Sequence, residues 1–219
     1  TSYGVSHLSL YNLTYADKTP IGRAYKRGAI NGQKDTQLYN LYKHACERLA
    51  ANGFLQEEVS NWHQPGYESR HNHKYWQCQP YLAVGVSAAG FLPDSNSLIG
   101  QRYIYSSSIK SFLNTKLESL TNFHALDTLK LESRTSYDWL VEYVGCSVRT
   151  QKGCDLNLIK KITGYNFKIN ETINNAIKHK QIKILEETIT LHPLEWFRET
   201  SWCVELLTCF CPPTTSSII

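Results

Sequence analysis

Residues 35–61, DTQLYNLYKHACERLAANGFLQEEVSN, carry a helical pattern that is followed at once by a strand pattern. Asp35 is a suitable N-cap, Asn52-Gly53 is a stop signal, and between them apolar side chains return at helical spacing, at Leu38, Leu41, Tyr42, Ala45 and Leu49. We therefore expect one amphipathic helix here, and a strand over residues 54–61.

A further strand is expected upstream of that helix. Residues 5–14, VSHLSLYNLT, alternate with period two and place Leu8 and Leu10 on one face. Strand, helix and strand form a βαβ unit, so the two strands are expected to be parallel neighbours. The polar opposite face of the first strand is typical of a barrel strand whose inner side looks at a ligand.

The pattern changes after residue 108, where the chain becomes rich in helices. Two short helices opened by Asp155 and Asn170, followed by alternating strands, predict a winged helix. The sequence therefore predicts an α/β fold, with strands and helices of a partial barrel over residues 1–108 and a helical, winged-helix-like domain over residues 109–219. The segments expected in the second part are helices at 109–117, 127–144, 155–163, 170–180 and 193–208, and strands at 182–185 and 188–191.

The composition indicates a globular chain. Of the 219 residues 42% are hydrophobic and 19% are charged, which is too little charge for a disordered segment. No apolar run approaches eighteen residues and no signal region opens the chain, so we expect no membrane span and a cytoplasmic location. The chain begins with Thr1 and contains no methionine, and we expect its natural start of translation to precede it. Its seven cysteines show no CxxC pair, which predicts reduced and mostly buried thiols.

The densest group of chemically useful side chains is PGYESRHNHKYW, residues 65–76. Its His71-Asn72 followed by Tyr75-Trp76 matches an HNxxYW signature, and on these residues the chain resembles the HemW haem chaperones. These are relatives of the oxygen-independent coproporphyrinogen III oxidases in the radical-SAM superfamily, and the resemblance implies that residues 1–108 are part of a radical-SAM-type barrel. The resemblance extends, in the same order, to HLSLYNLT at 7–14, EVSN at 58–61 and RTQKG at 149–153, and one departure is Glu57, where the family commonly has Tyr.

The resemblance implies a protein that binds haem and delivers it to a haem-accepting protein, respiratory haem proteins among the acceptors. It also implies a 4Fe–4S cluster, held by a CxxxCxxC motif, and S-adenosylmethionine, near which the backbone at Thr14 and Ala89 is expected. The seven cysteines contain no such motif. We therefore expect this chain to correspond to the C-terminal part of a HemW-like protein, to partner its own N-terminal barrel half, and to have no catalysis of its own.

The chemistry of residues 65–76 also suits a tetrapyrrole. A haem iron takes a neutral imidazole as axial ligand, which assigns His71 to the iron, and Asn72 could orient that imidazole. Flat rings stack on the macrocycle, and basic side chains such as Lys74 pair with its propionates. The expected haem site comprises Arg70, His71, Asn72, Tyr75 and Trp76.

Two other interpretations of this segment stay open at the level of sequence. In the first, Tyr75 and Trp76 are ordinary core aromatics and His71 caps a loop beneath them. In the second, a zinc ion is held by donors that fall within sixteen residues, although their spacing matches no common zinc module. The candidate zinc ligands are His63, His71, His73 and Cys78.

Other functions find less support. The adjacent pair Glu57-Glu58 would point to opposite faces of a strand, which argues against paired acid–base catalysis. An oxygen-independent coproporphyrinogen oxidase is the enzyme alternative, and a winged-helix nucleic-acid module is a further one. Seven lysines lie between Lys152 and Lys183, but the helix expected at 170–180 has no arginine, the commonest reader of guanine edges, so nucleic-acid binding is not expected.

Overall fold

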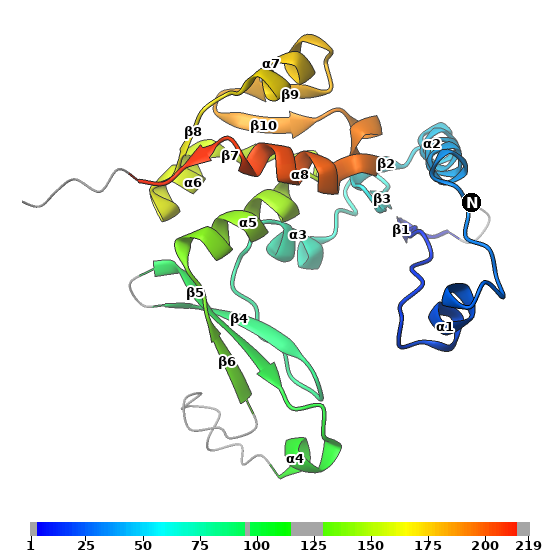
Figure 1. The fold of residues 1–219 in the computed structure, drawn as a ribbon, viewed down its shortest axis with the longest axis vertical. Helices are drawn as coiled ribbons and strands as arrows, with labels where there is room; N and C mark the ends of the chain where they lie inside the picture. The colour runs from blue at the N-terminus through cyan, green and yellow to red at the C-terminus, as the bar shows by residue number, and fades with distance from the viewer. Residues whose placement is uncertain (1–3, 95–96, 115–128, 214–219) are drawn as a thin grey trace, which may run out of the picture.

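The computed structural model describes residues 4–94, 97–114 and 129–213, in which helices combine with small sheets (Figure 1). The strand orders in the described part of the chain are β1-β3-β2, β4-β5-β6, β7-β10-β9 and β11-β8, and every pairing between these strands is antiparallel. The mixed α/β class is therefore confirmed. In the described residues, no helix is both long and apolar enough to cross a membrane.

The first sheet corrects the expected βαβ unit. Strands β1 (His7–Ser9) and β2 (Leu55–Glu58) do not pair with each other, because β3 (Asn61–His63) lies between them and is antiparallel to both. The single strand expected at 54–61 thus ends early. The Glu58 carboxylate accepts a hydrogen bond from the Ser60 backbone N–H at 2.9 Å, and this contact stabilises the turn that sends the chain back as β3.

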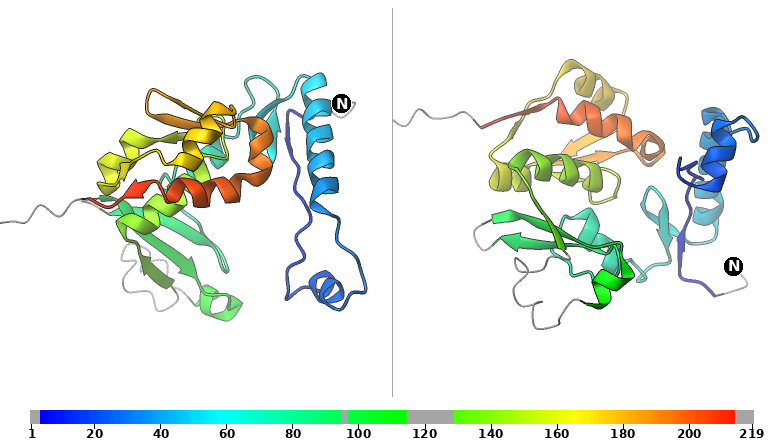
Figure 2. Two further views of the ribbon diagram at one scale, coloured as in Figure 1. Left: turned by 45° about the horizontal axis from the view of Figure 1, so that its top comes forward. Right: turned by 60° about the horizontal axis from the view of Figure 1, so that its bottom comes forward.

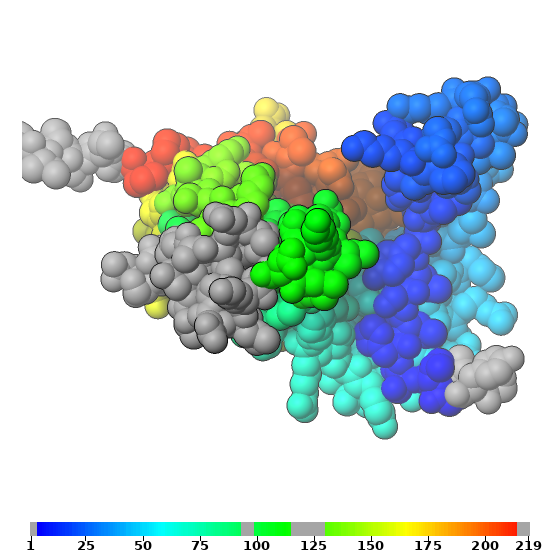
Figure 3. All heavy atoms as spheres, turned by 90° about the horizontal axis from the view of Figure 1, so that it is seen from below, coloured from blue at the N-terminus to red at the C-terminus, as the bar shows by residue number. Residues whose placement is uncertain are grey.

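Helix α2 (Asp35–Ala51) confirms the helix expected from the opening stretch, with Lys34 rather than Asp35 as N-cap. None of its residues is fully buried. The helix touches the C-terminal part through the Tyr42 hydroxyl, which donates to the Pro193 carbonyl at 3.2 Å. Together with β1 and α1 (Pro20–Lys26), α2 forms a layer along one side of the molecule (Figures 2 and 3).

The helix expected at 127–144 is wrong in its first part, where the chain forms a strand of the second sheet. Residues 127 and 128 lie outside the described residues. Residues Leu129–Ser133 form β6, because LKLES alternates with period two and pairs along β5 (Ser97–Tyr105). Helix α5 (Ser136–Ser147) begins only after a capping box in which Thr135 and Asp138 bond each other's backbone N–H. The sheet is completed by β4 (Ala89–Asp94), and β5 leads into α4 (Ile109–Leu113). A division at residue 108 would separate the paired strands β5 and β6.

The C-terminal part confirms the predicted winged helix. Its elements run helix, strand, helix, short strand, helix, strand, strand, and the first, third and fourth of these strands form the order β7-β10-β9. The predicted caps Asp155 and Asn170 accept the N–H groups of Leu158 and Ile173. Its core is built from buried side chains that include Trp139, Leu140, Ile159, Ile173, Ile182, Ile189 and Leu206. The elements after α5 are β7 (Cys154–Asp155), α6 (Leu156–Thr163), β8 (Asn166–Phe167), α7 (Glu171–Lys178), β9 (Ile182–Leu185), β10 (Thr188–Leu191), η3 (Pro193–Arg198), α8 (Glu199–Leu207) and β11 (Phe210–Cys211).

Glu195 joins η3 to its neighbours. Its carboxylate accepts hydrogen bonds from Arg198 Nη2 at 2.6 Å, Trp202 Nε1 at 2.9 Å and Gln181 Nε2 at 3.2 Å. Burial by itself would raise the pKa of Glu195, but these hydrogen bonds outweigh it and hold the pKa below its ordinary value. The ionised carboxylate therefore stabilises the fold.

We predict that Glu195→Gln lowers the free energy of unfolding by about 1 kcal/mol at pH 7. Because the folded pKa is depressed, this contribution is complete above the ordinary pKa of about 4.3 and is lost as the pH falls through the folded value. Urea unfolding of both proteins at pH 7 and pH 3 measures the difference. An equal difference at the two pH values would contradict the assignment.

Candidate functional site

Two adjacent buried carboxylates organise the site. Glu57 and Glu58 end β2 and are only 5% and 2% exposed. Neighbouring side chains on a strand point to opposite faces, as expected from the sequence, and the two carboxylates accordingly bind different parts of the chain. Glu57 contacts α3 (Arg70–Trp76), and Glu58 contacts the segment that follows α5.

The Glu57 carboxylate anchors α3 at two points. Its Oε1 lies 2.5 Å from His73 Nε2, and its Oε2 accepts the backbone N–H of Ser69, the N-cap of α3, at 3.2 Å. His7 of β1 approaches the same carboxylate, with Nε2 3.8 Å from Oε2. The orientation of α3 on the first sheet is therefore fixed by one buried acid.

The Glu58 carboxylate joins three segments that are distant in sequence. It accepts hydrogen bonds from Asn61 Nδ2 at 2.6 Å and from Arg149 Nε at 2.5 Å. The Asn61 amide oxygen in turn accepts the Ser9 hydroxyl at 2.7 Å. The HLS, EVSN and RT segments on which the sequence resemblance rests thus meet in one network around the buried Glu58 carboxylate.

Helix α3 presents one open face that carries His71 and Tyr75. The Ser69 hydroxyl caps the helix by accepting the backbone N–H of Asn72 at 3.3 Å, and positions 71 and 75 then fall one turn apart on the same side. His71 Nε2 lies 3.2 Å from the Tyr75 hydroxyl, and the two rings meet edge to face at 4.8 Å between centroids. His71 is exposed and Tyr75 is half-buried.

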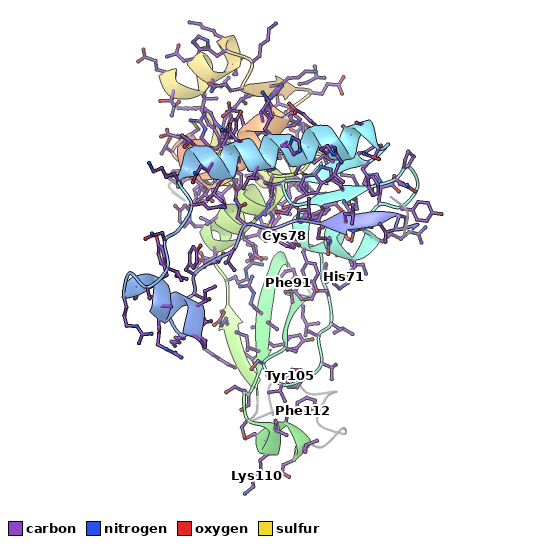
Figure 4. All side chains as sticks on the ribbon, turned by 90° about the vertical axis from the view of Figure 1, so that its right-hand side faces the viewer. His71, Cys78, Phe91, Tyr105, Lys110 and Phe112 are labelled. Carbon is purple, nitrogen blue, oxygen red and sulfur yellow. The ribbon has the colours of Figure 1, made fainter. Side chains whose placement is uncertain are left out.

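A second phenol ring extends this face. Tyr81 packs edge to face on Tyr75, with 4.4 Å between the ring centroids. Two backbone hydrogen bonds of 3.0 Å hold Tyr81 to Phe91 of β4. The exposed cations Arg70 and Lys74 belong to the same helix. We call the four α3 residues Arg70, His71, Lys74 and Tyr75, together with the neighbouring Tyr81, the open face of α3. His71 and Phe91, the strand residue that holds Tyr81, are labelled in Figure 4.

Trp76, the second aromatic residue expected in the haem site, lies on another side of α3. Trp76 is 9% exposed and turns into the body of the protein, where its ring meets His73 edge to face at 5.2 Å. It lines a cavity of about 500 Å³ together with Cys78, Trp139 and Tyr143. Tyr75 and Trp76 thus lie on different sides of α3, and Trp76 supports the helix from behind.

The two positions expected near S-adenosylmethionine lie on separate elements. Thr14 is exposed in the connection between β1 and α1, where its carbonyl accepts the Ala16 N–H at 3.0 Å. Ala89 opens β4 and pairs with Ile104 of β5. Their roles remain predictions.

The zinc interpretation is not supported. Among the residues that the structure describes, which include all four candidates, no three His, Cys, Asp or Glu side chains are grouped so that they could hold a metal ion. His63 Nδ1 donates to the Gln64 carbonyl at 2.8 Å, and His73 Nε2 lies against the Glu57 carboxylate. These donors serve the fold.

Sequence reasoning missed the organising residues of this site. From the sequence, Glu57 is only one of two adjacent acids that are too divergent for paired acid–base catalysis. His73 is only a candidate zinc ligand. Tyr81 was not singled out at all. The available signal was a pair of acids in a stretch expected to form a strand beside Phe54, Leu55 and Val59, since a charge that is buried there needs a partner.

We predict that Glu57→Ala loosens α3 without unfolding the chain. Loss of the carboxylate leaves His73 and the Ser69 N–H without their buried partner, which costs about 2 kcal/mol. Backbone amides of residues 71–79 are then expected to exchange with solvent at least tenfold faster in hydrogen–deuterium exchange.

The matched control is Glu47→Ala, which removes an exposed acid on α2 whose contact with Lys43 is 3.9 Å long. Exposed pairs of this kind contribute about 0–1 kcal/mol, so exchange in α3 is expected to stay unchanged. Equal exchange rates in the Glu57→Ala and Glu47→Ala proteins would show that Glu57 does not anchor the helix.

Comparison with known proteins agrees with the sequence resemblance. No protein-family model matches the chain. The chain is 35% identical to haem chaperone HemW of Lactococcus lactis over 86 residues, which are 39% of this chain and 23% of the relative. It is 38% identical to HemW of Mycobacterium tuberculosis over 89 residues, which are 41% of this chain and 23% of the relative. It is also 38% identical over 88 residues, 40% of this chain and 20% of the relative, to the mitochondrial radical S-adenosyl methionine domain-containing protein 1 of Danio rerio.

Among solved structures, the coproporphyrinogen III oxidase HemN of Escherichia coli, described as a radical SAM enzyme, has a similar fold. The TM-score is 0.57 at 12% identity, and the match covers 93% of this chain and 48% of that one. The chain thus spans about half the length of this solved protein, and its matched stretches span less than a quarter of the curated relatives. In sequence the chain resembles the HemW haem chaperones, and in fold it resembles part of a radical SAM enzyme.

Proposed function

We propose that the chain binds haem on the open face of α3, with His71 as the axial ligand of the iron. The observation that carries the proposal is an exposed imidazole that contacts the Tyr75 ring, which in turn packs on Tyr81, on a short anchored helix that also carries two exposed basic side chains. The sequence similarity to haem chaperones supports the same cargo.

Each component of the open face has a role in this proposal. His71 Nε2 is accessible to an iron because its contact is the exposed Tyr75 hydroxyl at 3.2 Å, a weak bond that is replaced at little cost. Tyr75 and Tyr81 offer ring surface to the macrocycle. Arg70 and Lys74 can pair with propionates, and an arginine does so in bidentate fashion.

The exposure of His71 suits transfer as well as binding. A haem held by one protein ligand on an open surface keeps the other face of its iron free, so a ligand from an acceptor protein can approach it. A haem-accepting protein, such as a respiratory haem protein, is therefore the partner in this proposal, and a cytoplasmic location goes with it. Asn72 and Trp76 position His71 in this proposal. The Asn72 N–H is capped by the Ser69 hydroxyl, and the Trp76 ring packs on His73.

The proposal includes no reaction that depends on a 4Fe–4S cluster. A 4Fe–4S cluster needs closely spaced thiolates, and the seven cysteines of the chain contain no CxxxCxxC motif. The residues present therefore do not fit the cluster. Thr14 and Ala89 are proposed as backbone contacts of S-adenosylmethionine in a longer protein that has the barrel half. The similar fold of HemN makes a coproporphyrinogen oxidase the second candidate.

We predict that ferric haem titrated into the chain gives a shifted Soret band with one haem per chain, and that His71→Ala weakens binding at least tenfold. The matched control is His44→Ala, because His44 is likewise exposed and lies on α2. Circular dichroism verifies that both variants are folded. Equal affinities in the two variants would exclude His71 as the ligand, and no Soret shift in the unmodified chain would exclude the function.

A further inference from the structure

The cavity behind α3, of about 500 Å³, is walled by large rings that come from two helices. Trp76 of α3 and Trp139 and Tyr143 of α5 all line it and are all buried. The Trp139 and Tyr143 rings are stacked, with 4.7 Å between their centroids and 12° between their planes. Leu158 and Ile162, one turn apart on α6, extend the apolar wall. Small-molecule sites have this size and this predominantly apolar, aromatic lining.

Two side chains of opposite charge, Lys152 and Asp155, belong to the same lining. Both are exposed, so they lie at the mouth of the cavity, whereas the rings lie at its base. The ion pairs within the described part of the chain include neither of them. Asp155 Oδ1 accepts the Leu158 N–H at 3.0 Å as the cap of α6, which leaves its second oxygen available. The mouth therefore offers one cation and one anion to a ligand.

The backbone that carries these two charges is fixed by its neighbours. Gly153 adopts φ 72°, and a Cβ at this position would lie 2.2 Å from the Ile189 carbonyl oxygen, so the close approach to β10 requires glycine. Cys154 and Asp155 then pair with β10, and the Asp155 N–H donates to the Tyr143 hydroxyl at 3.3 Å. A mouth that is already in place does not have to be ordered when a ligand binds, which favours affinity.

We propose that this cavity binds a free amino acid that has an aromatic side chain. The flat ring enters the apolar base, where Trp139 and Tyr143 offer ring surface. At the mouth, the ammonium group of the ligand pairs with Asp155 and its carboxylate pairs with Lys152. A zwitterion suits this mouth better than a ligand with a single charge, because it gives both side chains a partner. The other basic side chain of the wall, His73, is already held by Glu57.

The experiment titrates the full chain with L-tryptophan and with two analogues of the same shape, by isothermal titration calorimetry. Indole-3-propionate lacks the ammonium group of tryptophan, and tryptamine lacks its carboxylate. The proposal expects one tryptophan per chain and at least about threefold weaker binding of each analogue, as the loss of one exposed charge pair implies. Equal affinities for the three compounds would show adventitious apolar binding only, and absence of tryptophan binding would exclude the site. Either result overturns the proposal.

Variants assign each end of the ligand to its partner. Lys152→Gln is expected to weaken tryptophan binding at least about threefold and to leave tryptamine binding unchanged, because tryptamine has no carboxylate to lose. Asp155→Asn is expected to weaken tryptophan binding to a similar extent and to leave indole-3-propionate binding unchanged. Asparagine caps a helix as well as aspartate does, so α6 keeps its N-cap. The matched control is Lys161→Gln, which removes an exposed lysine of α6 outside the cavity lining. An equal loss in this control would overturn the assignment.

The amino-acid site is independent of the proposed haem site. The comparison of the three compounds is made on the unmodified chain, so it does not depend on the folding of any variant. His71 is not part of the cavity lining, and His71→Ala is therefore expected to leave tryptophan affinity unchanged. Loss of tryptophan binding in this variant would contradict the placement in the cavity. Failure of the amino-acid site leaves the haem proposal intact, and the reverse holds as well.

Discussion

The burial of two consecutive carboxylates at the end of one short strand constrains the rest of this structure. Charged groups that leave water need partners, and Glu57 and Glu58 find theirs on opposite sides of β2. On one side the partner is α3, which carries the open face. On the other it is Arg149, which follows α5, the first helix of the winged helix. The two acids thus connect the N-terminal sheet both to α3 and to the winged helix.

This arrangement separates the two sides of α3. The buried side, with His73 and Trp76, is engaged by Glu57 and by the cavity shared with α5. The opposite side is thereby free to expose His71 without losing its position. A helix of seven residues is too short to be stable in isolation, so an exposed ligand on it requires such anchoring from outside the helix. Pre-organisation of the open face is therefore a property of the network rather than of the helix.

The sequence predicted those elements whose signals are local. The winged helix followed from the caps Asp155 and Asn170 and from alternating strands, and the structure confirms it. The parallel pairing of the first two strands was predicted wrongly, because it depends on the tight turn at Ser60 and on long-range contacts that periodicity does not contain. In the site, residue types indicated haem chemistry at His71, whereas the anchoring role of Glu57 required knowledge of which distant groups it meets.

The most direct test of this account is nuclear magnetic resonance of the chain with ¹⁵N-labelled histidine rings, recorded before and after addition of ferric haem. The account predicts that the ring nitrogens of His71 alone show the large contact shifts of a ligand bound to paramagnetic iron, whereas His73, its neighbour on α3, shows only the broadening that proximity to the iron causes. Iron-ligand shifts on any other histidine, or on none of the eight, would contradict it.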